Sequence, residues 1–341
     1  MFYDIIVMGS GPSACAAALR CRRIGLSVLI VTERSQKDSE EFYEGLCFRP
    51  KESICLDAGG VIAGLEVGPA FEAARSGSYL GVISAGGACV PGFGPKGPQK
   101  GFNIDRSLFD CLLLEMCMGK GVDVLFEEKI DAFVEQGRRI TGVRTSSGKK
   151  IAGRYVIDGT GVGQMGGRRL GLKKLLLSPP FKVWTGIGAM KGNFESGWAY
   201  FIPRKTGWTW LAPEADGRCS WTRLSHFSLN SYDPPAQISV HSITHRSVFN
   251  RRWRIYRPVC KAGVILCGDA AGVLDPAAGQ GVLNALETGH VAGDLAHRIF
   301  CKPEREAAYL EEYDKWFFNR YMQKAILLDQ LYGINLKQYY E

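Results

Sequence analysis

A glycine-rich turn near the start of the chain has the residue types and spacing needed to hold a phosphate group. Gly9, Gly11 and Ala14 follow a short apolar run, Tyr3 to Met8, and open an alanine-rich segment. Gly9 permits a tight turn, Gly11 lets the backbone approach a pyrophosphate, and Ala14 lets a helix pack closely. A strand, turn and helix in this order predict a dinucleotide site. The cofactor-binding residues predicted here are Gly9, Gly11, Pro12, Ser13 and Ala14.

A carboxylate follows the next predicted strand. The apolar, β-branched run Ser27 to Val31 is followed by Thr32 and Glu33. An acid about 20 residues after such a turn can accept hydrogen bonds from an adenosine ribose. A surface acid is the alternative interpretation of Glu33 taken alone. We assign Glu33 and its neighbour Arg34 to the cofactor site.

A third element lies in the last third of the chain. Gly268 and Asp269 directly follow the buried run Gly263 to Cys267, and a segment containing Pro276 and several glycines then leads into a helix. An acidic residue directly after a buried strand, followed by a glycine-rich entry into a helix, again favours cofactor binding.

These three elements resemble the FAD-dependent monooxygenase superfamily, which includes aromatic hydroxylases, flavin halogenases and geranylgeranyl reductases. The resemblance extends over nearly the whole chain. It implies that Asp269 binds the flavin ribityl chain and that the next helix faces the polar edge of the isoalloxazine. Backbone donors and a positive helix end stabilise a reduced, anionic flavin. The residues implied at this end are Gly268, Asp269, Pro276, Gly279, Gln280, Gly281 and Val282.

Two further segments fit the same superfamily. The stretch Asp105 to Asp110 implies that Arg106 lies near the cofactor, and the stretch Val156 to Gly161 implies a turn of Asp158 and Gly159 near the adenine half. The alternatives are an ion pair at a helix start and a hairpin, respectively.

The segment Gly207 to Pro213 bears on which reaction the flavin performs. Trp208 and Trp210 share one face of a predicted strand. The segment resembles the G-W-x-W-x-x-P stretch of halogenase-like flavoproteins and of flavoproteins that mature quinone-cofactor amine and amino-acid oxidases, where it lines the space beside the flavin. We therefore predict that both tryptophans wall the substrate space. Two tryptophans that only pack in the core are the alternative.

A halogenase also needs a lysine between flavin and substrate. Residues 60–100 lack the sequence context expected for it, and Lys51 lies nearby in a different context. The stretch Glu44 to Pro50 takes the place of the family's Gly-Glu-Ser loop with another residue order. These observations disfavour halogenation.

Composition limits the remaining classes. The chain has 341 residues, a formal net charge of +8 and 11 cysteines. The cysteines form no C-x-x-C pair, so we expect neither a metal site nor a disulfide framework. No run approaches the roughly 20 apolar residues of a membrane span, and the start lacks a secretion signal. We expect a cytoplasmic protein without a transmembrane segment, and no long basic run or motif predicts nucleic-acid binding.

The elements that must position these residues predict an α/β fold, in which a Rossmann-like FAD-binding domain is interleaved with a mainly antiparallel substrate sheet. Helices are expected at Cys15 to Leu26, Ser107 to Met118 and Gly279 to Phe300, and segments between Val122 and Ile157 are expected to form a small antiparallel meander that returns to the core sheet. The FAD-binding domain is assigned to 1–75, 102–168 and 258–300, the substrate domain to 76–101 and 169–257, and a helical tail to 301–341.

The predicted activity is that of an FAD-dependent monooxygenase. The flavin, reduced by NAD(P)H or by a flavin reductase partner, would react with oxygen to give a hydroperoxide, which transfers an oxygen atom to an electron-rich aromatic substrate. A tryptophan side chain of a partner polypeptide is one candidate substrate, by resemblance. The alternatives are a geranylgeranyl-reductase-like enzyme that reduces isoprenoid double bonds, a flavin-dependent halogenase, and a non-catalytic flavin-binding adaptor that docks through its aromatic C-terminal tail.

Overall fold

The computed structural model describes residues 1–36, 51–55, 64–84, 100–192, 194–204, 207–225, 234–275 and 281–332, together with Leu336 and Gln338. Of the residues singled out in the sequence, Glu44, Pro276, Gly279 and Gln280 lie outside these ranges. Within the described residues, no helix combines the length and the hydropathy of a membrane span.

The core of the fold is a mostly parallel sheet in the order β18-β19-β10-β1-β2-β7. The strand β1 lies at its centre between β10 and β2, parallel to both. All four residues of β2 are buried, as expected for a strand covered on both faces. The sheet strands are β1 (Phe2–Met8), β2 (Val28–Val31), β7 (Asp123–Leu125), β10 (Lys150–Asp158), β18 (Cys260–Lys261) and β19 (Val264–Leu266).

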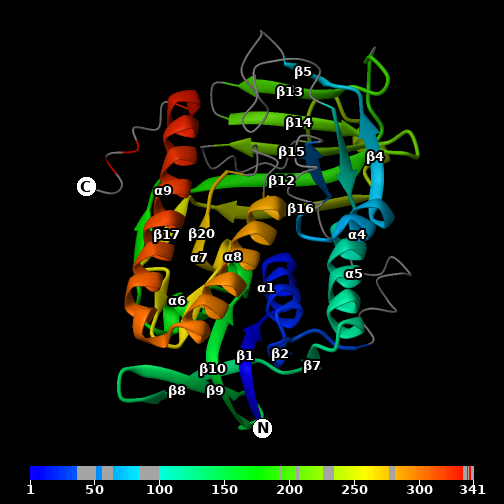
Figure 1. The fold of residues 1–341 in the computed structure, drawn as a ribbon. Helices are drawn as coiled ribbons and strands as arrows, with labels where there is room; N and C mark the ends of the chain where they lie inside the picture. The colour runs from blue at the N-terminus through cyan, green and yellow to red at the C-terminus, as the bar shows by residue number, and fades with distance from the viewer. Residues whose placement is uncertain are drawn as a thin grey trace.

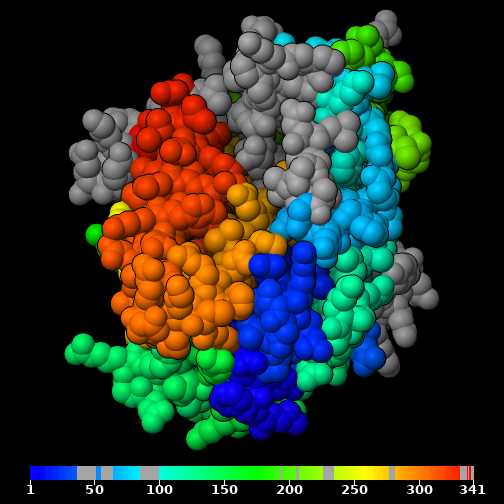
Figure 2. All heavy atoms as spheres, in the orientation of Figure 1, coloured from blue at the N-terminus to red at the C-terminus, as the bar shows by residue number. Residues whose placement is uncertain are grey.

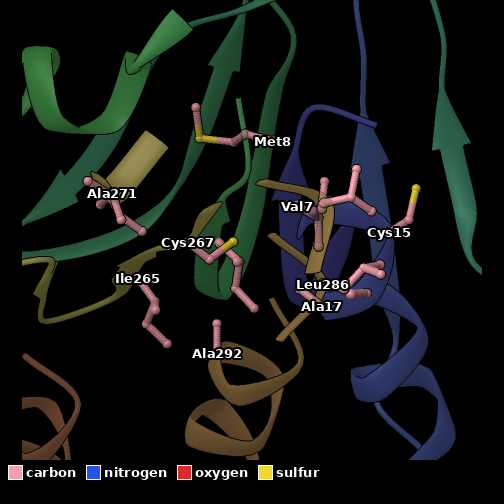
Figure 3. Close-up of a cluster of buried hydrophobic side chains, with 14 of the residues drawn as sticks. Val7, Met8, Cys15, Ala17, Ile265, Cys267, Ala271, Leu286 and Ala292 are labelled. Carbon is pink, nitrogen blue, oxygen red and sulfur yellow. The ribbon is translucent and has the colours of Figure 1, made fainter. Parts of the chain in front are cut away.

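Two helices from opposite ends of the chain pack against each other on this sheet. The helices α1 (Pro12–Arg23) and α8 (Gly281–Cys301) lie side by side in Figure 1. A Cβ on Gly289 would fall 2.1 Å from the Ser13 carbonyl oxygen, so only glycine permits this close approach. Val7, Cys15, Cys267 and Leu286 fill the space around the contact (Figure 3).

The strands β8 (Ile130–Gln136) and β9 (Arg139–Thr145) form an antiparallel pair that continues into β10. This is the predicted meander with its return to the core sheet. The first segment differs, because β7 does not join the meander but pairs in parallel with β2 at the edge of the core sheet. The residue pattern of a short edge strand does not reveal its partner, which is set by long-range packing.

A second, six-stranded sheet has the order β16-β12-β15-β14-β13-β5 and is antiparallel except between β13 and β5. In Figure 1 it lies at the end of the molecule opposite the β8–β9 hairpin. Two three-stranded sheets, β11-β17-β20 and β3-β6-β4, complete the β structure of the described residues. The bounds are β3 (Glu52–Cys55), β4 (Arg75–Tyr79), β5 (Val82–Ser84), β6 (Gly101–Ile104), β11 (Lys173–Leu176), β12 (Phe181–Gly188), β13 (Ala199–Arg204), β14 (Gly207–Pro213), β15 (Cys219–Ser225), β16 (His245–Arg251), β17 (Arg254–Arg257) and β20 (Gly272–Val273).

The remaining helices connect and cover these sheets. In the space-filling view, α8 and α9 cover one side of the visible face, next to α1 and α5 (Figure 2). Asp105 caps α5, because its carboxylate accepts hydrogen bonds from the Ser107 and Leu108 amides. The bounds are α4 (Gly68–Ala73), α5 (Arg106–Gly119), α6 (Met165–Arg169), α7 (Gly268–Ala271) and α9 (Glu306–Tyr332), with 3-10 turns η3 (Gly161–Gly163), η4 (Val240–Ser242) and η6 (Pro303–Arg305).

Four aromatic residues of α9 face inward, while Trp316 and Phe318 of the same helix are half-buried. Tyr309, Tyr313, Phe317 and Tyr321 recur every four residues along α9 and are all buried. The Tyr313 hydroxyl donates to the Leu266 carbonyl oxygen at 2.8 Å, which joins α9 to the core sheet. This stripe is therefore core packing, and the adaptor hypothesis loses the docking surface on which it depended.

Candidate active site

A cavity of about 650 Å³ runs from the carboxyl ends of β1, β2 and β10 to the six-stranded sheet. Gly9, Thr32 and Gly159 follow these three strands and line one end of the cavity. Ligands of open α/β sheets bind at this edge, outside the carboxyl ends of the strands. The cavity therefore has the position of a cofactor site, and its volume is that of a small-molecule pocket.

The glycine turn holds two glycines with different tasks. Gly9 has a φ of +90°, and a Cβ there would lie 2.9 Å from the Gly159 carbonyl oxygen. Gly11 has an ordinary φ of −82°, and a Cβ there would meet no atom within 4 Å. Gly9 is thus required by the fold, whereas Gly11 opens a space beside the N-terminus of α1. The residues present fit the phosphates of a dinucleotide.

Glu33 and Arg34 line the cavity beyond this turn. The Glu33 carboxylate is 67% exposed and lies 3.1 Å from Lys129 Nζ, so it remains accessible to a ribose. Arg34 points toward α5, and its Nη2 donates to Asp110 Oδ2 at 3.3 Å.

The buried side chain of Asp158 stabilises the neighbouring turn after β10. Its buried carboxylate accepts hydrogen bonds from the Thr160 amide, the Thr160 hydroxyl and the Gly166 amide at 2.9, 2.6 and 2.6 Å. Burial raises the pKa of this carboxyl, and the donated hydrogen bonds oppose the rise. The segment is a strand end and a tight turn, so the hairpin alternative is wrong.

Arg106 and Asp110 form an ion pair one turn apart on α5. Arg106 Nε and Nη2 donate to the two oxygens of Asp110 at 3.0 and 3.1 Å, and Asp110 is fully buried. Burial works against the charge of Arg106, but Asp110 and Glu52 raise the pKa of its guanidinium, which stays protonated. The ion pair is thus present, and Arg106 also lines the cavity in which the cofactor is predicted to bind.

Residues from the last third of the chain also line this cavity. Asp269, Gly281 and Val282 line the cavity, while Gly268 lies behind them with its amide donating to the Thr288 hydroxyl at 2.9 Å. The Asp269 carboxylate lies 3.8 Å from Arg251 Nη1 and is 37% exposed.

The six-stranded sheet forms the far wall. Trp208 and Trp210 both line the cavity, and both belong to the main hydrophobic core. Paired positions carry a row of cavity-lining side chains across the sheet at the level of Trp210, and a more apolar row runs beside it. The first row is Ser247, Thr185, Thr222, Trp210 and Phe201, and the second includes Phe249, Val183 and Trp208.

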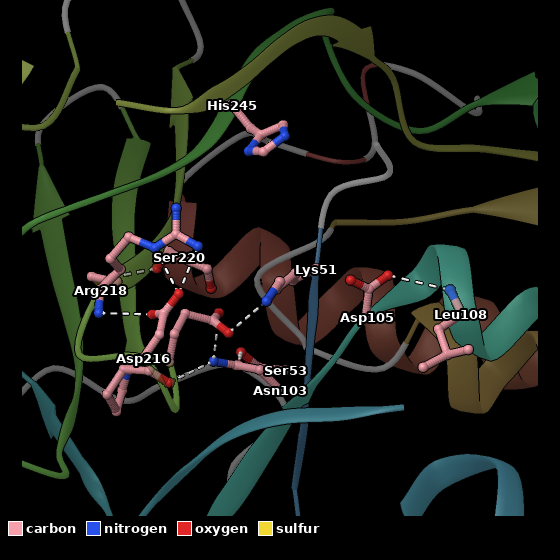
Figure 4. A network of polar contacts seen from close by, with 12 residues as sticks. Lys51, Ser53, Asn103, Asp105, Leu108, Asp216, Arg218, Ser220 and His245 are labelled. Atoms are coloured by element: carbon pink, nitrogen blue, oxygen red, sulfur yellow. Dashed lines mark hydrogen bonds and ion pairs between the residues drawn. The ribbon is translucent and has the colours of Figure 1, made fainter. Parts of the chain in front are cut away.

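A chain of hydrogen bonds leads from Trp210 to Lys51, which the sequence context had disfavoured. The Trp210 indole N–H donates to Ser53 Oγ at 2.9 Å, and Ser53 donates to Asn103 at 2.7 Å. Asn103 Nδ2 donates to one oxygen of Glu214 at 3.2 Å, and Lys51 Nζ donates to the other at 2.8 Å. Figure 4 shows Lys51, Ser53 and Asn103 close together within this network. Lys51 lines the cavity, and Glu214 is only 2% exposed.

The structure brings most of the predicted site residues to one cavity. Ala14, Asp158 and Gly268 support its wall without lining it. Sequence reasoning considered Lys51 and set it aside, missed Glu52 and Glu214, and gave Asp110 no role. The local sequence gave no signal for these residues, although Lys51, Glu52 and Ser53 all line the cavity.

The comparison with known families decides the affiliation. Residues 94–332 match the profile of the tryptophan halogenase family, and residues 4–43 match that of an FAD binding domain. The chain belongs to the tryptophan halogenase family. It is an FAD-dependent oxidoreductase with a Rossmann-type α/β fold, as predicted.

Individual relatives of this family member carry different activities in their names. Digeranylgeranylglycerophospholipid reductase 2 of Methanococcoides burtonii is 24% identical over 92% of this chain and 80% of its own length. The myxobacterial chondrochloren halogenase CndH has a TM-score of 0.78 at 18% identity, over 98% of this chain and 83% of its own. The peptidyl tryptophan dihydroxylase QhpG has a TM-score of 0.72 at 19% identity, over 98% and 75%. At these identities, the two structures support the fold alone.

Proposed function

We propose that this family member reduces carbon–carbon double bonds of an isoprenoid chain with electrons from FAD. The observation that carries the proposal is the apolar part of the cavity wall, which is lined by Val183, Trp208, Phe249 and Val282. Such a wall binds an alkyl chain by burying its surface. The relatives named digeranylgeranylglycerophospholipid reductases support reduction over the hydroxylation expected from the sequence.

In this proposal, FAD supplies the reducing equivalents when it is bound and reduced. The turn at Gly9 and Gly11 would hold its pyrophosphate, Glu33 its ribose, and Asp269 its ribityl chain. The six-stranded sheet would orient the substrate and exclude water with Trp208 and Trp210.

Halogenation is a second candidate because of one observation. Lys51 stands on the cavity wall, and the buried carboxylate of Glu214 holds its ammonium group at 2.8 Å. Lys51 is therefore a candidate for the lysine that a halogenase needs between flavin and substrate.

One experiment separates these reactions. FAD-loaded protein, reduced with dithionite without oxygen, is incubated with geranylgeraniol in detergent, and a parallel sample receives oxygen, bromide and an indole. We expect the isoprenoid to gain two hydrogen atoms for each double bond reduced, as measured by mass spectrometry. Unchanged isoprenoid together with a brominated or hydroxylated indole would replace the proposal by halogenation or hydroxylation.

The wall tryptophans provide a test within the chain. We expect Trp208→Leu and Trp210→Leu to keep near-normal FAD content but to lower turnover per bound flavin by about tenfold to a hundredfold, because the ring that positions the substrate is lost. Trp253→Leu is the matched control, since Trp253 is fully buried against Phe181 and lies away from the cavity. It should lower the melting temperature and leave turnover per bound flavin unchanged. The same pattern in the Trp208 and Trp210 variants would return both residues to a purely structural role.

A further inference from the structure

Glu52, at the start of β3, contacts the N-terminus of α8 in the wall of the cofactor cavity. Its Oε1 accepts a hydrogen bond from the Val282 amide at 2.8 Å, and its Oε2 accepts one from Arg106 Nη1 at 3.1 Å. Both side chains are about four-fifths buried, and both line the cavity. A Cβ on Gly281 would come within 2.8 Å of Glu52 Oε1, so a glycine there makes room for the carboxylate.

This carboxylate bonds to Arg106 and to a backbone amide at the N-terminus of α8. Positive groups of this kind were expected to stabilise an anionic flavin. The amide groups in the first turn of α8 carry the positive end of the helix dipole. Glu52 accepts from one of them and also neutralises Arg106, which already pairs with Asp110. Arg34 contacts Asp110 from the other side. Among the described residues, this cluster contains two arginines and two carboxylates, whose formal charges cancel.

The charge next to a flavin sets how readily the ring accepts electrons. Reduction by two electrons near neutral pH leaves the ring with a negative charge, so positive groups favour the reduced form and negative groups disfavour it. A site with Arg106 and a bare helix end would favour reduced FAD. With Glu52 in place, most of that preference is cancelled.

We propose that Glu52 lowers the reduction potential of the bound flavin and so makes the reduced enzyme a stronger electron donor. Asp269 also acts on Arg106 through its charge, and its carboxylate lies 3.8 Å from Arg251 Nη1. Among the described residues, Glu52 is the carboxylate that bonds both to Arg106 and to the first turn of α8. The proposal concerns the cofactor and holds for any substrate of the enzyme.

The test is the midpoint potential of bound FAD in Glu52→Gln, measured by equilibration with a reference dye. Removing one negative charge should raise the affinity for reduced FAD relative to oxidised FAD by about tenfold, which is an upward shift of about 30 mV for a two-electron couple. Sulfite gives a second measurement, because its adduct with oxidised flavin also places negative charge on the ring. We expect Glu52→Gln to bind sulfite about tenfold more tightly than the unaltered protein.

Two control variants make the test specific. Glu52→Asp keeps the charge but withdraws it from the Val282 amide, so its potential should lie between those of the unaltered protein and Glu52→Gln. Glu287→Gln breaks an ion pair between Glu287 of α8 and Arg320 of α9. Glu287 lies about 9 Å along the helix from Gly281, so this variant should leave the potential unchanged.

A potential in Glu52→Gln equal to or below that of the unaltered protein would overturn the proposal. If Glu52→Gln does not retain FAD, Glu52→Asp decides, and the absence of any upward shift in that variant refutes the role of Glu52. No measurement involves a substrate, so failure here is distinct from failure of the proposed reaction.

Discussion

A Gly11→Val variant should be folded and colourless. The valine side chain would enter the open space beside the N-terminus of α1, where the cofactor phosphates are proposed to bind, and its backbone φ is one that valine can adopt. We expect FAD affinity to fall by more than about a hundredfold, or about 2.7 kcal/mol. The measurement is flavin content after gel filtration, with far-ultraviolet circular dichroism to verify the fold.

Gly9→Val is the control, because the same change two residues earlier has another consequence. Its Cβ would lie 2.9 Å from the Gly159 carbonyl oxygen, and its φ of +90° is strained for a β-branched residue. This variant should be too unstable to give folded protein for a measurement of cofactor binding. Normal FAD content in folded Gly11→Val would show that the cofactor phosphates do not bind at this turn.

Asp110→Ala is expected to destabilise the protein by about 3–5 kcal/mol. The change removes the fully buried carboxylate that pairs with both Arg106 and Arg34, while Arg106 keeps its pair with Glu52. Urea denaturation should show a lower midpoint at a similar slope. FAD binding should weaken as well, because both arginines line the cavity.

The exposed pair of Asp131 and Arg144 provides the comparison. Arg144 also donates two hydrogen bonds to its carboxylate, at 3.1 and 3.2 Å, but the pair lies at the surface. We expect Asp131→Ala to cost less than about 1 kcal/mol. Equal losses in the two variants would show that burial of Asp110 does not determine the effect.

Local patterns in the sequence were sufficient for much of the fold. The turn after β1 and the helices α5 and α8 each carry their signal within one continuous segment. The position of β7 carries no such signal, since its pairing with β2 depends on residues about 90 positions away. The aromatic stripe of α9 was recognised, but only the surrounding structure shows which surface it covers.

The site residues were predictable where one continuous segment carries the sequence motif and also forms that part of the cavity wall. Gly11, Glu33 and Asp269 belong to such segments, and each lines the cavity. Lys51 and Glu214 lie 163 residues apart, and their contact depends on the pairing of β3 with β6 and on Asn103 between them. Glu52 reaches α8 across 230 residues. No spacing rule links positions that meet only after two sheets have formed.

The close packing of α1 against α8 has a consequence for how the chain is made. Synthesis reaches α1 long before the glycines on which that helix rests, because those glycines belong to residues 281–301. The buried face of α1 lacks its final neighbour until α8 has been made, and β1 lacks its neighbour β10 until residues 150–158 have been added. Exposed apolar surface of this kind invites aggregation and chaperone binding. Nascent chains arrested before residue 281 should therefore remain sensitive to protease throughout the region that will hold FAD.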